Sequence, residues 1–204
     1  MTERERMLSG QLYNPADPEL AAERLRAKIL CRRFNDAPPE AFAEREELLQ
    51  QLLGSMGHDC WIEPSFLCDY GSQITLGDHV YANYDCIFLD AAPISIGSHA
   101  FLAPRVCLFT AGHPLDTNVR NSELEFALPI TIEDNVWLGG NVTVLPGVTI
   151  GSGTVVAAGS VVTKDLPAGV VAAGNPCRVL REITDADRAN WEARRAAYAA
   201  ECGT

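Results

Sequence analysis

Long apolar runs are missing from this sequence, and their absence limits what the chain can be. No stretch of 18 consecutive apolar residues occurs, although a helix that spans a bilayer needs about 20. The N-terminal segment MTERERMLSG alternates charges and lacks the apolar core of a secretory signal peptide. We therefore expect a chain that does not span a membrane and that is located in the cytoplasm.

Cysteine pairs of the CxxC type are also missing. The seven cysteines are odd in number and are scattered along the chain. Without a secretion signal, such spacing favours reduced thiols that behave as small and mostly buried apolar side chains. We therefore expect no disulfide framework.

Positive charge is scarce in the middle of the chain. Residues 58–181 hold five basic side chains against twelve acidic ones, and three of the five lie among the last 18 positions of that segment. These three are Lys164, Arg178 and Arg181. The net charge of −11 argues against nucleic-acid binding. A basic cluster at one end of an acidic body indicates either an anion site or a solvated surface.

The N-terminal quarter has the pattern of helices. Asp17 and Pro18 are residue types that cap and begin a helix. A second amphipathic pattern follows and ends at Gly54 or Gly57. These signals predict a helical cap over residues 1–57.

The C-terminal end also has a helix signal, and the length of 204 residues suits one substantial domain with helical additions. Thr184 and Asp187 have the spacing of a capping box, in which each side chain bonds to the backbone of the other residue. We predict a C-terminal helix within residues 182–204.

A six-residue repeat occupies the centre of the chain. Every sixth position is aliphatic in the series Ile132, Leu138, Val144, Ile150, Val156 and Val162. The same frame covers residues 76–88 and 96–108, and the blocks are related by a superperiod of 18. This period predicts three short strands in each coil of a triangular parallel β-helix, with the aliphatic side chains pointing inward. The fold is thus expected to be mainly β, with the β-helix domain at residues 58–181.

The repeat fails between Leu108 and Ile132. Residues 110–131 form a long polar excursion, and His113 stands near its beginning in the sequence TAGHP. Long irregular loops inside compact repeats are usually functional. We therefore regard His113 as the leading candidate for a functional side chain.

The motifs of this chain resemble those of the hexapeptide-repeat acyltransferases, and within them the maltose and galactoside O-acetyltransferases. They are GQLYNPADPELAAERLRAK, CDYG, YANYDC, TAGHP, NVWLGGNVTVLPGVTIG and VVAAGNPCRVLREI, and they extend over residues 8–185. The resemblance implies a left-handed β-helix and a homotrimer with its active sites between subunits. It also implies acetyl transfer from acetyl-CoA to a sugar hydroxyl, with the maltose enzymes as the better match.

The resemblance also assigns roles to individual residues. His113 would be the general base, because a neutral imidazole can take the proton of a hydroxyl as its oxygen attacks a thioester. Acceptor binding is implied for Asp69, Tyr81, Asn83 and Asp90. The implied CoA contacts are Trp137, Gly139, Gly140, Ala158, Thr163, Lys164, Arg178 and Arg181, of which the last three form the basic cluster. Trp137 has core packing as an equal alternative.

Two departures leave the acceptor open. Related enzymes often have an acidic residue where this chain has Ala91, and some galactoside relatives have one where it has Pro15. These departures leave the identity of the sugar open, and a non-sugar hydroxyl is a separate alternative acceptor. A zinc hydratase on the same solenoid would need three histidines around one metal, and the four histidines here lack the close spacing of such enzymes. A non-catalytic scaffold is a further alternative, and we expect no metal.

Overall fold

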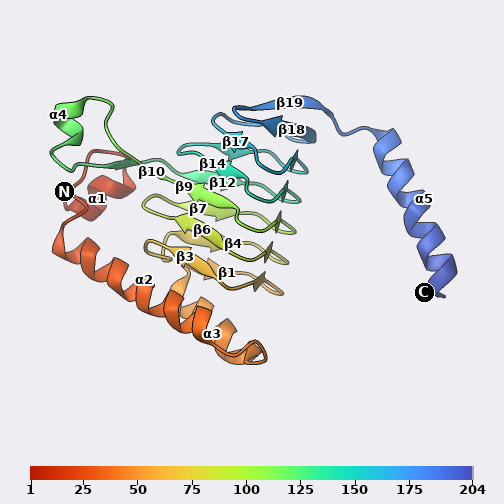
Figure 1. The fold of residues 1–204 in the computed structure, drawn as a ribbon, viewed down its shortest axis with the longest axis horizontal. Helices are drawn as coiled ribbons and strands as arrows, with labels where there is room; N and C mark the ends of the chain where they lie inside the picture. Colours follow the sequence, from red (N-terminus) through yellow and green to blue (C-terminus); the bar gives the residue numbers. More distant parts are fainter. Residues whose placement is uncertain (204) are drawn as a thin grey trace.

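The computed structural model describes residues 1–203, and a parallel β-helix forms its body (Figure 1). Sheet I contains β1 (Ser55–Met56), β4 (Ile74–Leu76), β7 (Ile94–Ile96), β12 (Ile130–Ile132) and β15 (Thr149–Ile150). Sheet II contains β2 (Trp61–Ile62), β5 (Tyr81–Ala82), β8 (Phe101–Leu102), β13 (Trp137–Leu138), β16 (Val155–Val156), β18 (Val170–Gly174) and β19 (Cys177–Glu182). Sheet III contains β3 (Phe66–Cys68), β6 (Cys86–Leu89), β9 (Cys107–Phe109), β14 (Thr143–Val144) and β17 (Val161–Val162).

From β1 to β9 and again from β12 to β17, strands that follow one another in the sequence lie in different sheets, so the chain winds around the three walls and each coil stacks on the one before it. Ile94 pairs in register with Ile74 on one side and with Ile130 on the other. All six members of the aliphatic series beginning at Ile132 are at most 1% exposed. Burying an aliphatic side chain stabilises the fold by roughly 1.5–3 kcal/mol. The expected hexapeptide-repeat β-helix is thus confirmed.

The N-terminal cap closes one end of this core. It consists of α1 (Glu3–Leu8), α2 (Pro18–Asp36) and α3 (Phe42–Leu52). The Asp17 carboxylate accepts the Glu19 and Leu20 N–H groups, which begins α2 as predicted. Buried residues of α2 and α3, among them Phe34, belong to the same apolar cluster as the first coils. The cap is therefore continuous with the core of the solenoid.

Two boundaries differ from the sequence prediction. Strand β1 lies within the predicted cap range but pairs in parallel with β4 of sheet I. A strand of two residues is too short to give a periodic signal in the sequence. Helix α1 lies within the predicted helical cap, although no separate helix was assigned to these residues, and it is begun by a capping box between Thr2 and Glu5.

The excursion is folded rather than irregular. Strands β10 (Ala111–Gly112) and β11 (Phe126–Ala127) pair in antiparallel register, and the short helix α4 (Thr117–Arg120) lies between them. The excursion leaves the solenoid and lies beside α1 (Figure 1). It therefore brings the N-terminal segment and the middle of the chain together on one side of the molecule.

Helix α5 (Asp185–Cys202) ends the described chain and is begun by the predicted capping box between Thr184 and Asp187. It projects away from the solenoid, and none of its residues is buried (Figure 1). Within residues 1–203, no helix has the length and apolar character needed to cross a membrane.

Candidate active site

Two corners of the solenoid hold most of the predicted site residues. The II–III corner is formed by the segments between sheets II and III, at residues 63–65, 83–85, 103–106, 139–142 and 157–160. The III–I corner is formed by the segments that follow sheet III, at residues 69–73, 90–93, 110–129, 145–148 and 163–165. Sheet III separates these two corners within one chain.

A pocket of about 370 Å³ opens at the III–I corner, at the base of the excursion. It is lined by Tyr13, Pro15, Arg24, Asp69, Tyr70, Leu89, Ala91, Ala111, His113 and Glu125. These residues come from the N-terminal segment, from α2, from the ends of two strands of sheet III and from the excursion. The cap, the solenoid and the excursion therefore build this pocket together.

His113 faces a carboxylate across this pocket. Its side chain is 58% exposed, and its Nε2 lies 3.9 Å from Oε1 of Glu125. The other Glu125 oxygen accepts the Tyr13 hydroxyl at 2.7 Å. Burial and this hydrogen bond raise the Tyr13 pKa, so the phenol stays protonated and remains a donor. A carboxylate in this place stabilises an imidazolium that forms when His113 takes a proton.

The backbone fixes Glu125 in this position. Tyr13 and Glu125 form an isolated antiparallel bridge, with N···O distances of 3.0 and 3.1 Å. The N-terminal segment thereby holds the returning strand of the excursion opposite His113. Two segments more than 100 residues apart in the sequence are needed to place the imidazole and the carboxylate together.

Arg24 of α2 carries positive charge into the wall of the pocket. It donates to the Tyr70 hydroxyl at 2.7 Å and to the Pro15 carbonyl oxygen at 2.5 Å. Asp69 lies nearby, and its pKa is raised mainly by burial, an effect that Arg24 partly offsets. This wall therefore presents a guanidinium, a phenol and a carboxylate to any molecule in the pocket.

Asp90 lies beneath the pocket and not in it, which corrects its assignment to acceptor binding. The residue is fully buried. Its carboxylate accepts the backbone N–H groups of Asp69 at 3.0 Å, Tyr70 at 2.8 Å and Gln73 at 3.2 Å. Burial raises its pKa to about 6, against the opposite effect of its N–H donors. Asp90 replaces missing backbone partners at a turn, so it positions Asp69 and Tyr70.

Tyr81 and Asn83 lie at the other corner. Tyr81 is on β5 of sheet II, and Asn83 begins the next segment of the II–III corner. The Asn83 side-chain oxygen accepts the Tyr84 N–H at 2.8 Å, as a turn residue would. Of the four residues assigned to acceptor binding, only Asp69 shares the pocket with His113 in a single chain.

The predicted CoA contacts are divided between the corners as well. Gly139, Gly140 and Ala158 are at the II–III corner, whereas Thr163 and Lys164 are at the III–I corner. A Cβ atom at Gly139 would lie only 2.6 Å from the Ala158 backbone nitrogen in the next coil, so coil stacking requires glycine there. Gly140 has more space, because the nearest atom would be 3.4 Å away.

Trp137 is on the outer face of sheet II. Trp137 is 53% exposed, which excludes the alternative that it packs in the core. Neighbouring strands of sheet II place aromatic residues at paired positions. Trp61 pairs with Tyr81, Tyr81 with Phe101, and Phe101 with Trp137. Four aromatic residues therefore form a row along the outer face of sheet II.

The two arginines of the basic cluster are exposed on β19. Arg181 forms a bidentate ion pair with Asp187 of α5, with distances of 2.6 and 3.0 Å. Arg178 donates to the Cys177 carbonyl oxygen at 2.7 Å. The ion pair raises the Arg181 pKa and lowers the Asp187 pKa. Arg181 would have to exchange this partner in order to bind a phosphate with both of its outer nitrogen atoms.

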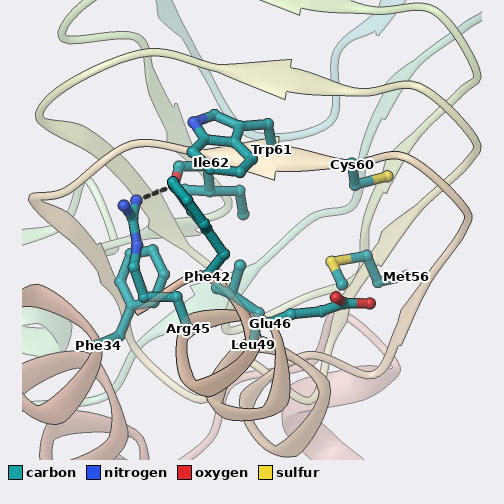
Figure 2. A pocket seen from close by; sticks show the side chains of 9 residues that line it. All are labelled: Phe34, Phe42, Arg45, Glu46, Leu49, Met56, Cys60, Trp61 and Ile62. Carbon is teal, nitrogen blue, oxygen red and sulfur yellow. Dashed lines mark hydrogen bonds between the residues drawn. The ribbon is translucent and has the colours of Figure 1, made fainter. Parts of the chain in front are cut away.

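A second pocket, of about 90 Å³, lies between the cap and the first coil (Figure 2). Arg45 is buried there, with its guanidinium 5.2 Å from the Phe34 ring centre and 5.3 Å from that of Trp61. It donates to the Ile62 carbonyl oxygen at 3.0 Å (Figure 2). None of the residues assigned to the site lines this pocket, and its arginine joins the cap to the solenoid.

The remaining histidines occupy turns. His79 and His99 lie at equivalent positions of neighbouring coils, and their rings stack with centres 4.7 Å apart. Across residues 1–203, no group of three or more histidine, cysteine, aspartate or glutamate side chains has the arrangement of a metal site.

Comparisons with known proteins place this geometry in a family. The maltose acetyltransferase hexapeptide capping motif matches residues 6–57, and the bacterial transferase hexapeptide model of six repeats matches residues 129–164. The galactoside O-acetyltransferase of Escherichia coli K12 is 42% identical over 184 residues, which are 90% of this chain and 91% of that protein. The chain belongs to the hexapeptide-repeat acetyltransferases.

Solved structures of this family have the same fold. A maltose O-acetyltransferase from Clostridium difficile 630 is 49% identical with a TM-score of 0.89, over 90% of this chain and 98% of that one. A galactoside acetyltransferase in complex with coenzyme A is 41% identical with a TM-score of 0.90, over 92% of this chain and 94% of that one. The family match thus covers the cap, the solenoid and the excursion.

Four polar pocket residues were missed in the sequence. They are Tyr13, Arg24, Tyr70 and Glu125. Tyr70 directly follows Asp69 within the motif CDYG, so it could have been identified as a candidate pocket residue from its neighbour. The other three lie in the cap and in the excursion, where no local pattern reveals which side chains face His113.

The role of Asp90 generates a prediction about stability. Replacing Asp90 with alanine leaves one buried and two partly buried N–H groups without their acceptor, which should lower the free energy of unfolding by roughly 3 kcal/mol. Urea denaturation measures this change. Asp69→Asn is the matched control, because it alters a neighbouring carboxylate that lines the pocket, and it should change stability much less. Equal stabilities of Asp90→Ala and the wild type would contradict the positioning role.

Proposed function

We propose that the protein is an acetyl-CoA-dependent O-acetyltransferase that modifies a hydroxyl group of a sugar of the maltose or glucose type. The observation that carries this proposal is the polar pocket in which the His113 imidazole faces the Glu125 carboxylate at 3.9 Å. Membership of the acetyltransferase family and the coenzyme A complex of a relative support the choice of donor.

In the proposed reaction, His113 takes the proton of the acceptor hydroxyl while the oxygen attacks the thioester carbonyl carbon. The new C–O bond forms as the C–S bond breaks, and the proton passes to the departing sulfur. Glu125 stabilises the imidazolium between these two proton transfers, and the Tyr13 hydroxyl holds Glu125. A base of this kind typically contributes roughly 10²- to 10⁴-fold to the rate.

The acceptor would lie against Asp69, Tyr70 and Arg24, which together offer donors and acceptors to sugar hydroxyls. Pro15 and Ala91 also line this pocket. By the resemblance, related enzymes often have an acidic side chain at the position of Ala91, and some galactoside relatives have one at the position of Pro15. The pocket therefore has fewer carboxylates for hydroxyl groups than the family pattern provides. This difference favours a non-sugar hydroxyl compound as the second candidate acceptor.

The donor would bind at the C-terminal end of the solenoid, where Lys164, Arg178 and Arg181 supply positive charge. Phosphate groups of coenzyme A are suitable partners for lysine and arginine. The small residues Gly140 and Ala158 leave room for the pantetheine arm beside the backbone, and Trp137 would form a wall. Thr163 completes the proposed donor site. Gly139 contributes indirectly, because it allows the coil that carries Ala158 to stack closely.

We further propose a homotrimer in which each active site lies between two subunits. In one chain, His113 and Lys164 are at a different corner from Asn83 and Gly140, so one copy alone does not bring the site residues together. In the aromatic row on sheet II, Trp61, Phe101 and Trp137 are exposed and Tyr81 is half-buried, and this row supports a subunit contact there, because such a row is seldom left in water. A closed ring of three copies would join one corner to the other.

The first functional prediction concerns the base. His113→Ala should lower kcat roughly 10²- to 10⁴-fold, while the Kd for acetyl-CoA changes little, because the phosphates would be held elsewhere. Acetyl-CoA consumption over a panel of sugars and alcohols, followed by free-thiol release, measures kcat. His58→Ala removes another exposed histidine outside the pocket and should retain activity. If His113→Ala keeps most of its kcat, the base assignment is wrong.

The basic cluster gives a separate prediction. Lys164→Ala should raise the KM for acetyl-CoA more than the KM for the acceptor, and the difference should shrink in high salt because salt screens charges. Steady-state kinetics at two ionic strengths measures both constants. Arg33→Ala is the control, because this exposed arginine lies in the last turn of α2, in the cap at the other end of the solenoid (Figure 1). A loss confined to the acceptor KM would mean that the donor and acceptor ends are reversed.

A further inference from the structure

Two buried thiols meet where the cap contacts the first coil. Cys31 is on α2 and Cys68 is on β3, and their sulfur atoms lie 3.6 Å apart. Cys31 is 2% exposed and Cys68 is 7% exposed. Other cysteine sulfurs have different partners, since those of Cys86 and Cys107 contact backbone carbonyl oxygens. Cys31 and Cys68 are therefore buried thiols in direct contact with one another.

A surface pocket gives access to this pair. It has a volume of about 340 Å³ and is lined by Lys28, Cys31, Arg32, Asn35, Asp36, Leu67 and Cys68. It shares no residue with the pocket that contains His113. The pair therefore lies at the wall of a surface pocket, although each cysteine is almost fully buried.

The hydrogen bond between the two thiols makes them unequal. Donation from Cys68 lowers the Cys31 pKa, because it stabilises the Cys31 thiolate. The hydrogen bond with Cys31, followed by burial, raises the Cys68 pKa. A thiolate is the form that attacks an oxidant, so Cys31 is the better nucleophile, and Cys68 is in place to react with its product.

We propose that Cys31 and Cys68 are a reversible oxidation site, at which a peroxide converts the two thiols into a disulfide between the cap and the solenoid. The Cys31 thiolate attacks one peroxide oxygen, the O–O bond breaks, and Cys31 becomes a sulfenic acid. The Cys68 sulfur then attacks the Cys31 sulfur, and the S–S bond forms as water leaves. In total, two thiols and one hydrogen peroxide give one disulfide and two water molecules.

The geometry suits this bond. A disulfide requires about 2.05 Å between the sulfurs, so the two atoms must approach by about 1.5 Å from contacting positions. The bond would join α2, whose Arg24 contacts Tyr70, to the strand that ends immediately before Asp69. Oxidation would therefore fasten the cap to the segment that forms one wall of the proposed acceptor pocket.

Peptide mapping of the folded protein tests this proposal. The protein used carries one substitution, Cys202→Ser, which removes an exposed thiol that could link two chains. It is treated with hydrogen peroxide, alkylated, digested and analysed by mass spectrometry. We expect a linked pair of peptides containing residues 31 and 68, lighter by two hydrogens and separated again by dithiothreitol. The oxidised protein should have a Tm higher by roughly 5 °C, since the bond restricts the unfolded chain.

Three variants act as controls. Cys31→Ser and Cys68→Ser should each abolish the linked peptides and the rise in Tm, whereas Cys107→Ser should retain both. If a buried serine at position 31 or 68 prevents folding of its variant, the peptide mapping of the Cys202→Ser protein still decides the question. Free thiols at both positions after treatment, a sulfinic acid at Cys31 without a link, or a link between other cysteines would overturn the proposal.

Discussion

The in-register stacking of inward aliphatic side chains is the constraint on which this molecule depends. From the second coil onward, strands of the three walls contribute buried residues that rest on their equivalents in the coil before, as Ile94 does on Ile74. With three walls fixed in this way, only the corners can accept insertions without disturbing the core. The excursion therefore leaves from the III–I corner, and the pocket that contains His113 forms at its base.

The cap converts this corner into a site. Tyr13 pairs with the returning strand of the excursion and holds Glu125, and Arg24 of α2 reaches Tyr70 at the end of sheet III. Asp90 fixes the same turn from beneath by accepting three backbone N–H groups. The solenoid supplies a rigid edge, whereas the cap and the excursion supply most of the groups that face His113. This arrangement explains why the capping motif and the hexapeptide repeats occur in one chain.

The sequence predicted the parts of the structure that depend on local pattern. The hexad series identified the core, and Asp17, Thr184 and Asp187 marked true helix ends, because periodicity and capping act within a few residues. Asp90 was misassigned because burial and three backbone partners from other segments decide its role. Tyr13 and Glu125 were missed because they meet only through a long-range bridge. Whether a polar side chain faces a pocket or holds the backbone beneath it depends on long-range contacts, and the spacing of residues in the sequence does not reveal these contacts.

The central claim is that one subunit supplies His113 and its neighbour supplies Asn83, and subunit mixing tests it most directly. His113→Ala and Asn83→Ala proteins are each inactive or nearly so in this account. Co-refolded in equal amounts, they should form mixed trimers in which one site combines the intact corner of each parent. Since most trimers would be mixed, about a quarter of the wild-type activity should return. Activity that stays at the mean of the two parents would contradict a site shared between subunits.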